Sequence, residues 1–101
     1  MSNFSYNTDS AGILNAEGKV LDREKFITVI ILIIKNMCPQ IGQTYLTDTT
    51  PDQLTEVVPE VKPDGEILIK LRILITYYKI VAVVAHENNK KILKVKSFGA
   101  M

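Results

Sequence analysis

The sequence predicts an α+β fold: one long buried helix and one short helix packed on an antiparallel β-meander of two or three strands. Three observations support this class. A capped, strongly apolar stretch ends at Cys38-Pro39, and a second capping signal begins at Thr50. From Glu66 onward, β-branched residues are frequent and alternate with charged ones. A chain of 101 residues is long enough for one domain with a single core.

The first ten residues, "MSNFSYNTDS", are mostly polar. We expect residues 1–10 to form a flexible N-terminal arm and residues 11–101 to form the single domain. Two apolar pairs, Ile13-Leu14 and Val20-Leu21, flank a turn-like "NAEG" and predict a small hairpin there. The absence of a basic-then-apolar leader and the single cysteine favour a cytoplasmic protein.

The long helix is predicted for the stretch between Asp22 and Cys38. Asp22 is a good N-cap, Leu21 and Phe26 occupy the positions of a hydrophobic staple, and the residue before a proline avoids helical geometry. The β-branched run from 27 to 34 favours the alternative, a buried strand, but the caps and the length favour a helix. Its surface is apolar almost all round, so we expect it to need cover on two sides.

The short helix is predicted to start at Thr50, because Thr50, Pro51 and Gln53 have the pattern of a capping box with proline at the first helical position. Asp52 and Glu56 would then lie one turn apart. A catalytic or metal-binding pair is conceivable, but a first-turn acid that favours the helix dipole and an exposed helix residue explain them more simply.

Residues 66–85 raise the choice between a membrane span, a helix and strands. Lys70, Arg72 and Lys79 exclude a span and leave no single apolar stripe on a helix. Strand alternation places the odd-numbered residues from Ile67 to Tyr77 on one face. Lys79 breaks this parity, which predicts a bulge or reversal near residues 76–78. A turn at residues 86–91 and a final strand over 92–98 complete the meander.

No catalytic, cofactor-binding or metal-binding residue is predicted. Cys38 and His86 are the only cysteine and histidine, so a thiol–imidazole pair would depend on chance proximity. Paired metal-ligand spacings are missing and the five glycines are scattered. We therefore expect a protein that is not an enzyme and uses no cofactor.

A basic sheet face is the first candidate site. Residues 1–65 carry five basic and nine acidic side chains, whereas residues 66–101 carry seven basic and two acidic ones. The candidate face consists of Lys70, Arg72, Lys90, Lys91, Lys94 and Lys96. With Tyr77, Tyr78 and Phe98 as stacking residues it could bind nucleic acid. A solvated face and a face for an acidic protein are the alternatives.

A self-association surface is the second candidate site. Surplus apolar surface on the helix and on the segment "IVAVVA" predicts Ile27, Ile30, Ile31, Ile34, Val81 and Val83 as its members. The function expected from the sequence is thus a non-enzymatic protein–protein interaction module, a homodimer above other oligomers, with a protein partner as a further option. A small nucleic-acid-binding protein is the alternative function. No membrane span is expected.

Overall fold

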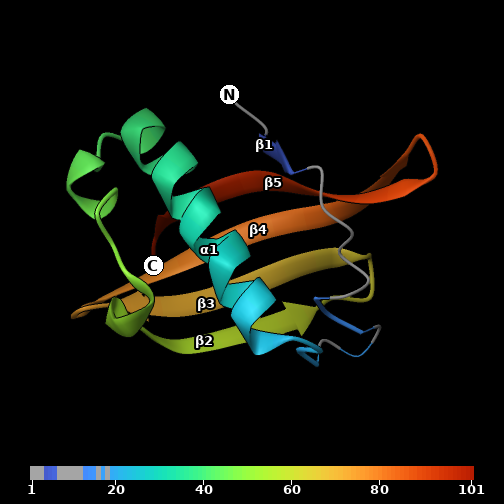
Figure 1. Cartoon of the computed structure of the whole chain (residues 1–101), viewed down its shortest axis with the longest axis horizontal. Helices are drawn as coiled ribbons and strands as arrows, with labels where there is room; N and C mark the ends of the chain where they lie inside the picture. The colour runs from blue at the N-terminus through green and yellow to red at the C-terminus, as the bar shows by residue number, and fades with distance from the viewer. Residues whose placement is uncertain (1–3, 7–12, 16, 18) are drawn as a thin grey trace.

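An α-helix lies diagonally across one face of an antiparallel β-sheet (Figure 1). The computed structural model describes residues 4–6, 13–15, 17 and 19–101 of the chain. The strands are β1 (Phe4–Tyr6), β2 (Leu54–Val61), β3 (Glu66–Ile73), β4 (Thr76–Glu87) and β5 (Lys90–Ala100). Their order is β1-β5-β4-β3-β2, so the four long strands form a meander and β1 extends its β5 edge. The predicted α+β class is confirmed, but the expected two or three strands are too few.

The long helix is confirmed as α1 (Arg23–Met37). The Asp22 side chain caps it, because its Oδ1 accepts a hydrogen bond of 3.1 Å from the backbone N–H of Lys25. Beyond Met37 the chain tightens into the 3-10 turn η2 (Cys38–Ile41), which contains Pro39 and stops at Gly42 with a positive φ of 78°. A second 3-10 turn, η3 (Thr44–Leu46), follows.

The expectation that this helix needs cover on two sides is wrong. Its sheet-facing residues Phe26, Val29, Ile30, Ile33 and Ile34 are buried, and Ile27 and Ile31 are half-buried at the flanks. Of the apolar residues on the outer side, only Leu32 is substantially exposed, at 42%. A sheet of four long strands is wide enough to absorb the surplus apolar surface that appeared to require a second cover.

The predicted short helix is also wrong, although its capping box forms. The Gln53 side chain accepts a hydrogen bond of 2.8 Å from the Thr50 backbone N–H, but only one 3-10 turn follows, η4 (Pro51–Gln53). From Leu54 the chain runs as β2 and pairs with β3, with a bulge between Thr55 and Val58 where Glu56 adopts a φ of 53°. Strand pairing outweighs the helix signal, and Pro59 is tolerated because β2 is an edge strand.

The reversal between β3 and β4 occurs earlier than predicted. Ile73 pairs with Thr76, so the turn consists of Leu74 and Ile75, and the parity change seen at Lys79 follows from it. Ile75 and Tyr77 therefore do not continue the buried face formed by Ile67 to Ile73. The turn between β4 and β5 was predictable, because Asn88 and Asn89 both adopt the positive φ that a two-residue hairpin requires.

The N-terminal hairpin is confirmed as a single bridge between Leu14 and Val20. Within the predicted arm, residues 4–6 form β1 beside β5, and the rest of residues 1–10 lies outside the described part of the chain. The core is the layer between α1 and the sheet, where Ile69, Leu71, Ile80 and Val95 are almost completely buried. No helix of the described part of the chain covers the opposite face of the sheet (Figure 1).

Candidate interaction surfaces

The face of the sheet turned away from α1, called the open face here, carries four of the predicted basic residues. Alternation along β3 directs Lys70 and Arg72 away from the buried Ile69, Leu71 and Ile73. Lys94 and Lys96 lie on the same side of β5, at the bulge where β4 and β5 change register. Lys90 and Lys91 belong to β5 next to the Asn88-Asn89 turn, and their side chains lie outside the described part of the structure.

Lys79 is a member of the open face that the sequence did not assign to the site. It is exposed and stands directly opposite Lys70 on the neighbouring strand. Gly99 is its partner on the other side, on β5, so no side chain shields it there. Like charges that face each other across two strands repel, and no ion pair to either lysine occurs among the described residues. The sequence signal that could have assigned Lys79 to this face was its odd-numbered position, which breaks the alternation of Lys70 and Arg72.

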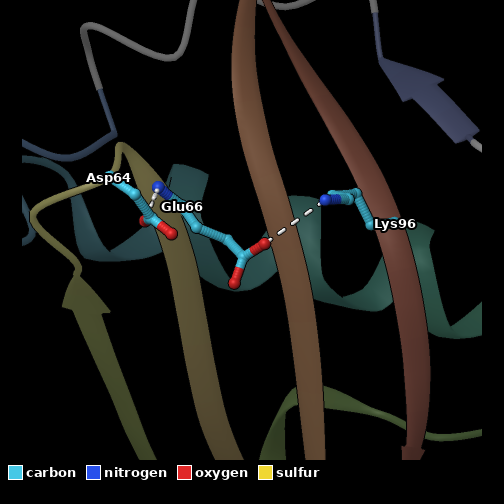
Figure 2. Close-up of polar contacts among 3 residues, drawn as sticks. All are labelled: Asp64, Glu66 and Lys96. Atoms are coloured by element: carbon cyan, nitrogen blue, oxygen red, sulfur yellow. Dashed lines mark hydrogen bonds and ion pairs between the residues drawn. The ribbon is translucent and has the colours of Figure 1, made fainter.

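An ion pair between described residues crosses the open face. The Nζ of Lys96 on β5 lies 3.3 Å from Oε2 of Glu66 on β3, and Figure 2 shows this contact passing over β4. The backbone N–H of Glu66 donates to Oδ1 of Asp64 in the preceding turn, at 3.0 Å. Because the Lys96 side chain is 54% exposed, water screens this pair and it contributes little to stability.

Two further polar side chains of the open face, Arg72 and Tyr77, have partners. Nε of Arg72 donates to Oγ1 of Thr55 on β2, at 2.9 Å. A hydrogen bond to the Glu56 side chain raises the pKa of Tyr77, which faces Arg72 across β3 and β4. Arg72 and Tyr77 are thus already engaged within the chain.

Only one of the three aromatic residues expected for base stacking is accessible. Tyr78 and Phe98 are 2% and 5% exposed, and their ring centroids lie 5.6 Å apart in a tilted pair inside the core. Tyr77 is 46% exposed. The prediction is wrong for Tyr78 because the register of the β3–β4 turn directs it to the core side of β4. It is wrong for Phe98 because the bulge between β4 and β5 directs that side chain to the core side of β5.

The predicted self-association residues do not form one surface. Ile30 and Ile34 are completely buried between α1 and the sheet, so a second copy of the chain cannot reach them. Ile27 and Ile31 flank the helix and are half-buried. Val81 and Val83 are half-buried on the other side of the molecule, on the open face. Ile30 and Ile34 cannot form an association surface, because their side of α1 packs against the sheet.

An apolar cluster that sequence reasoning missed lies around the β3–β4 turn. Four exposed residues around this turn are called the apolar end here: Tyr45, Leu74, Ile75 and Tyr77, which are 70%, 60%, 91% and 46% exposed. The first three line one pocket, whereas Tyr77 faces Arg72 on the open face. Leu74 holds a φ of 57°, a conformation that usually belongs to glycine or asparagine. A shallow pocket of about 170 Å³ borders the turn and is lined by Tyr45, Leu46, Thr49, Gln53 and Thr76, among others.

Cys38 and His86 are not brought together. His86 lines a cavity beside Phe26 in the first turn of α1, whereas Cys38 follows the last turn. Phe26 and Cys38 are twelve positions apart along the chain, which corresponds to about 18 Å along the helix axis. Burial raises the pKa of the Cys38 thiol to about 11, so at neutral pH it carries no thiolate nucleophile.

The described residues contain no cluster of three or more histidine, cysteine, aspartate or glutamate side chains suited to holding a metal ion. The helices in the described part of the chain are too short or too polar to cross a membrane. Neither a protein-family model, nor a curated protein, nor a solved structure matches this chain.

Proposed function

We propose that this protein is a non-enzymatic protein–protein interaction module that forms a homodimer through its apolar end. The observation that carries the proposal is the position of the exposed apolar residues. Among the described residues, four of the eight large apolar side chains with high exposure belong to this one end of the sheet. A concentration of exposed apolar side chains on a small domain is typical of an interaction site.

The apolar end also combines a projection with a recess. Ile75 projects from the turn at 91% exposure, and the 170 Å³ pocket lies directly beside it. In a two-fold dimer both partners contribute the same patch. The projecting Ile75 of each copy can therefore enter the pocket of the other copy, so the same contact forms twice. Leu46 and Thr49 give this pocket a buried floor, against which an aliphatic side chain can pack.

The strained turn supports the same proposal. A leucine with positive φ costs roughly 1–2 kcal/mol relative to an ordinary conformation. Glycine or asparagine would relieve the strain, yet Leu74 and Ile75 occupy both turn positions and expose their side chains. Exposed aliphatic residues in a strained turn are explained if they contact a partner.

The test is the mass of the protein by light scattering as it elutes from a sizing column, measured over a range of concentrations. We expect twice the 11.3 kDa of the chain at high concentration. Ile75→Asp should shift the protein to the monomer with little change in its unfolding midpoint. Leu32→Asp, at an exposed site on the outer side of α1, is the matched control and should remain dimeric. A monomeric wild type at every concentration would refute the proposal.

Nucleic-acid binding by the open face is the second candidate, supported by the unneutralised Lys70–Lys79 pair beside Gly99. A phosphate placed between the two lysines would relieve their repulsion. Among the described side chains, Tyr77 is the one accessible aromatic on this face, which ranks this function below dimerisation. A labelled single strand should be bound at low salt, and Lys70→Gln with Lys79→Gln should weaken binding. No shift of the strand at low salt would exclude this function.

A further inference from the structure

A half-open apolar cavity of about 280 Å³ lies at the end of the sheet remote from the β3–β4 turn. Its floor consists of the buried side chains of Phe26, Ile30, Ile67, Ile69 and Leu93, from α1, β3 and β5. Leu14, Val61 and Val84 are half-buried at its rim. The cavity thus has a large apolar interior built by five elements, α1, β2, β3, β4 and β5, and the N-terminal hairpin.

The volume of the cavity indicates the size of a ligand. An apolar cavity of about 150 Å³ is known to take up benzene, and small-molecule pockets begin near 300 Å³. A cavity of about 280 Å³ therefore fits an apolar body of about ten non-hydrogen atoms.

Two polar residues at the rim indicate the ligand's head group. Oδ1 of Asn15 already accepts hydrogen bonds from the backbone N–H groups of Glu17 and Lys19, each at 2.9 Å. The side chain of Asn15 is left with its Nδ2 group, which is a donor. The imidazole of His86, exposed at the same rim, also presents at least one N–H. The described lining residues include no carboxylate, and the two polar side chains among them, Asn15 and His86, both offer donors.

We propose that this cavity binds a small amphipathic molecule with an aliphatic body and a hydrogen-bond-accepting head group, such as the carboxylate of a medium-chain fatty acid. The aliphatic chain packs on Ile30, Ile67 and Leu93, and the head group accepts hydrogen bonds from Asn15 and His86. The site is separate from the apolar end, so its test is independent of the dimer.

The probe is octanoate, titrated below its micelle concentration into the 101-residue chain and followed by methyl and amide NMR. Saturable shifts are expected at Ile30, Val84 and Leu93, with no shifts at Ile75. Octylammonium, with the same chain but a donor head group, should bind at least five-fold more weakly. Equal binding of the two compounds, or no saturable shift with octanoate, would overturn the proposal.

Matched variants on one strand locate the site. Val84→Phe fills the cavity from β4 and should weaken octanoate binding at least ten-fold, whereas Val81→Phe, on the open face of the same strand, should not. If Val84→Phe does not fold, Val61→Phe on β2 fills the cavity from the neighbouring side. Octanoate binding that is unchanged in a folded cavity-filling variant would also refute the site.

Discussion

Lys70 and Lys79 stand directly opposite each other on β3 and β4, on the face of the sheet turned away from α1. Their neighbours in the same row are Val58 on β2 and Gly99 on β5, neither of which carries a charge. The one ion pair described on this face, between Glu66 and Lys96, lies nearer the β2–β3 turn. The centre of the open face is therefore positive and costs the fold some stability.

Reversing one of these charges should stabilise the protein. Lys79→Glu converts a repulsive cross-strand pair into an attractive one, and we expect the free energy of unfolding to rise by about 0.5 kcal/mol. Urea denaturation at low salt measures the change. The double variant Lys70→Glu, Lys79→Glu restores like charges and is the control, which should lose the gain. An equal gain in both variants would show that pairwise repulsion is not the cause.

Relieving the strain at Leu74 should raise the stability of the fold and at the same time weaken dimerisation. Leu74→Gly removes the unfavourable φ of 57°, and we expect a net gain of about 0.5 kcal/mol after the entropy cost of glycine. Ile75→Gly, at the neighbouring position without a positive φ, should instead lose about 0.5–1 kcal/mol. Both substitutions should weaken the dimer in light scattering. A loss of stability in Leu74→Gly would mean that the leucine packs better than its exposure indicates.

The helix should tolerate substitution on one side only. Ile34→Ala leaves a cavity under α1, where the side chain is completely buried, and we expect a loss of about 2–5 kcal/mol. Leu32→Ala, two residues away and 42% exposed, should cost less than about 1 kcal/mol. Thermal or urea unfolding of the two variants measures the contrast. Similar losses would place a second covering surface on the outer side of α1.

Stability should fall at alkaline pH through Cys38. Burial raises the pKa of its thiol from 9.0 to about 11, so the folded protein disfavours the thiolate. The stabilisation is complete below pH 9 and is lost as the pH rises toward 11, because the unfolded chain ionises first. Between pH 8 and pH 10.5 we expect wild type to lose about 2 kcal/mol more than Cys38→Ala.

Tyr78 makes the subtraction in that experiment necessary. Burial raises its pKa from 10.0 to about 12, with a smaller contribution from a hydrogen bond to the Tyr45 side chain. The stabilisation from the protonated Tyr78 side chain is lost at higher pH than the stabilisation from Cys38. Tyr78 is present in both wild type and Cys38→Ala, so the difference between the two proteins removes its contribution. Equal pH dependence of wild type and Cys38→Ala would show that the thiol is accessible to water.

Local signals in the sequence determined the elements that depend on few neighbours. The Asp22 cap and the stop at Pro39 defined α1 almost to the residue, and Asn88-Asn89 defined the last hairpin. The alternation after Glu66 established the strands and placed Lys70 and Arg72 on one face. In each case a side chain acts on its own backbone or on the period of its own segment.

Long-range pairing decided the rest. Residues 54–61 became β2 because β3 offered hydrogen-bond partners that a solitary short helix would not have had. Leucine and isoleucine do not favour turns, so the position of the turn at Leu74-Ile75 follows only from the register of β3 and β4. That register decided which aromatic residues enter the core, and the width of the sheet decided how much of α1 is buried. The apolar end and the cavity are products of these tertiary choices, which no single segment encodes.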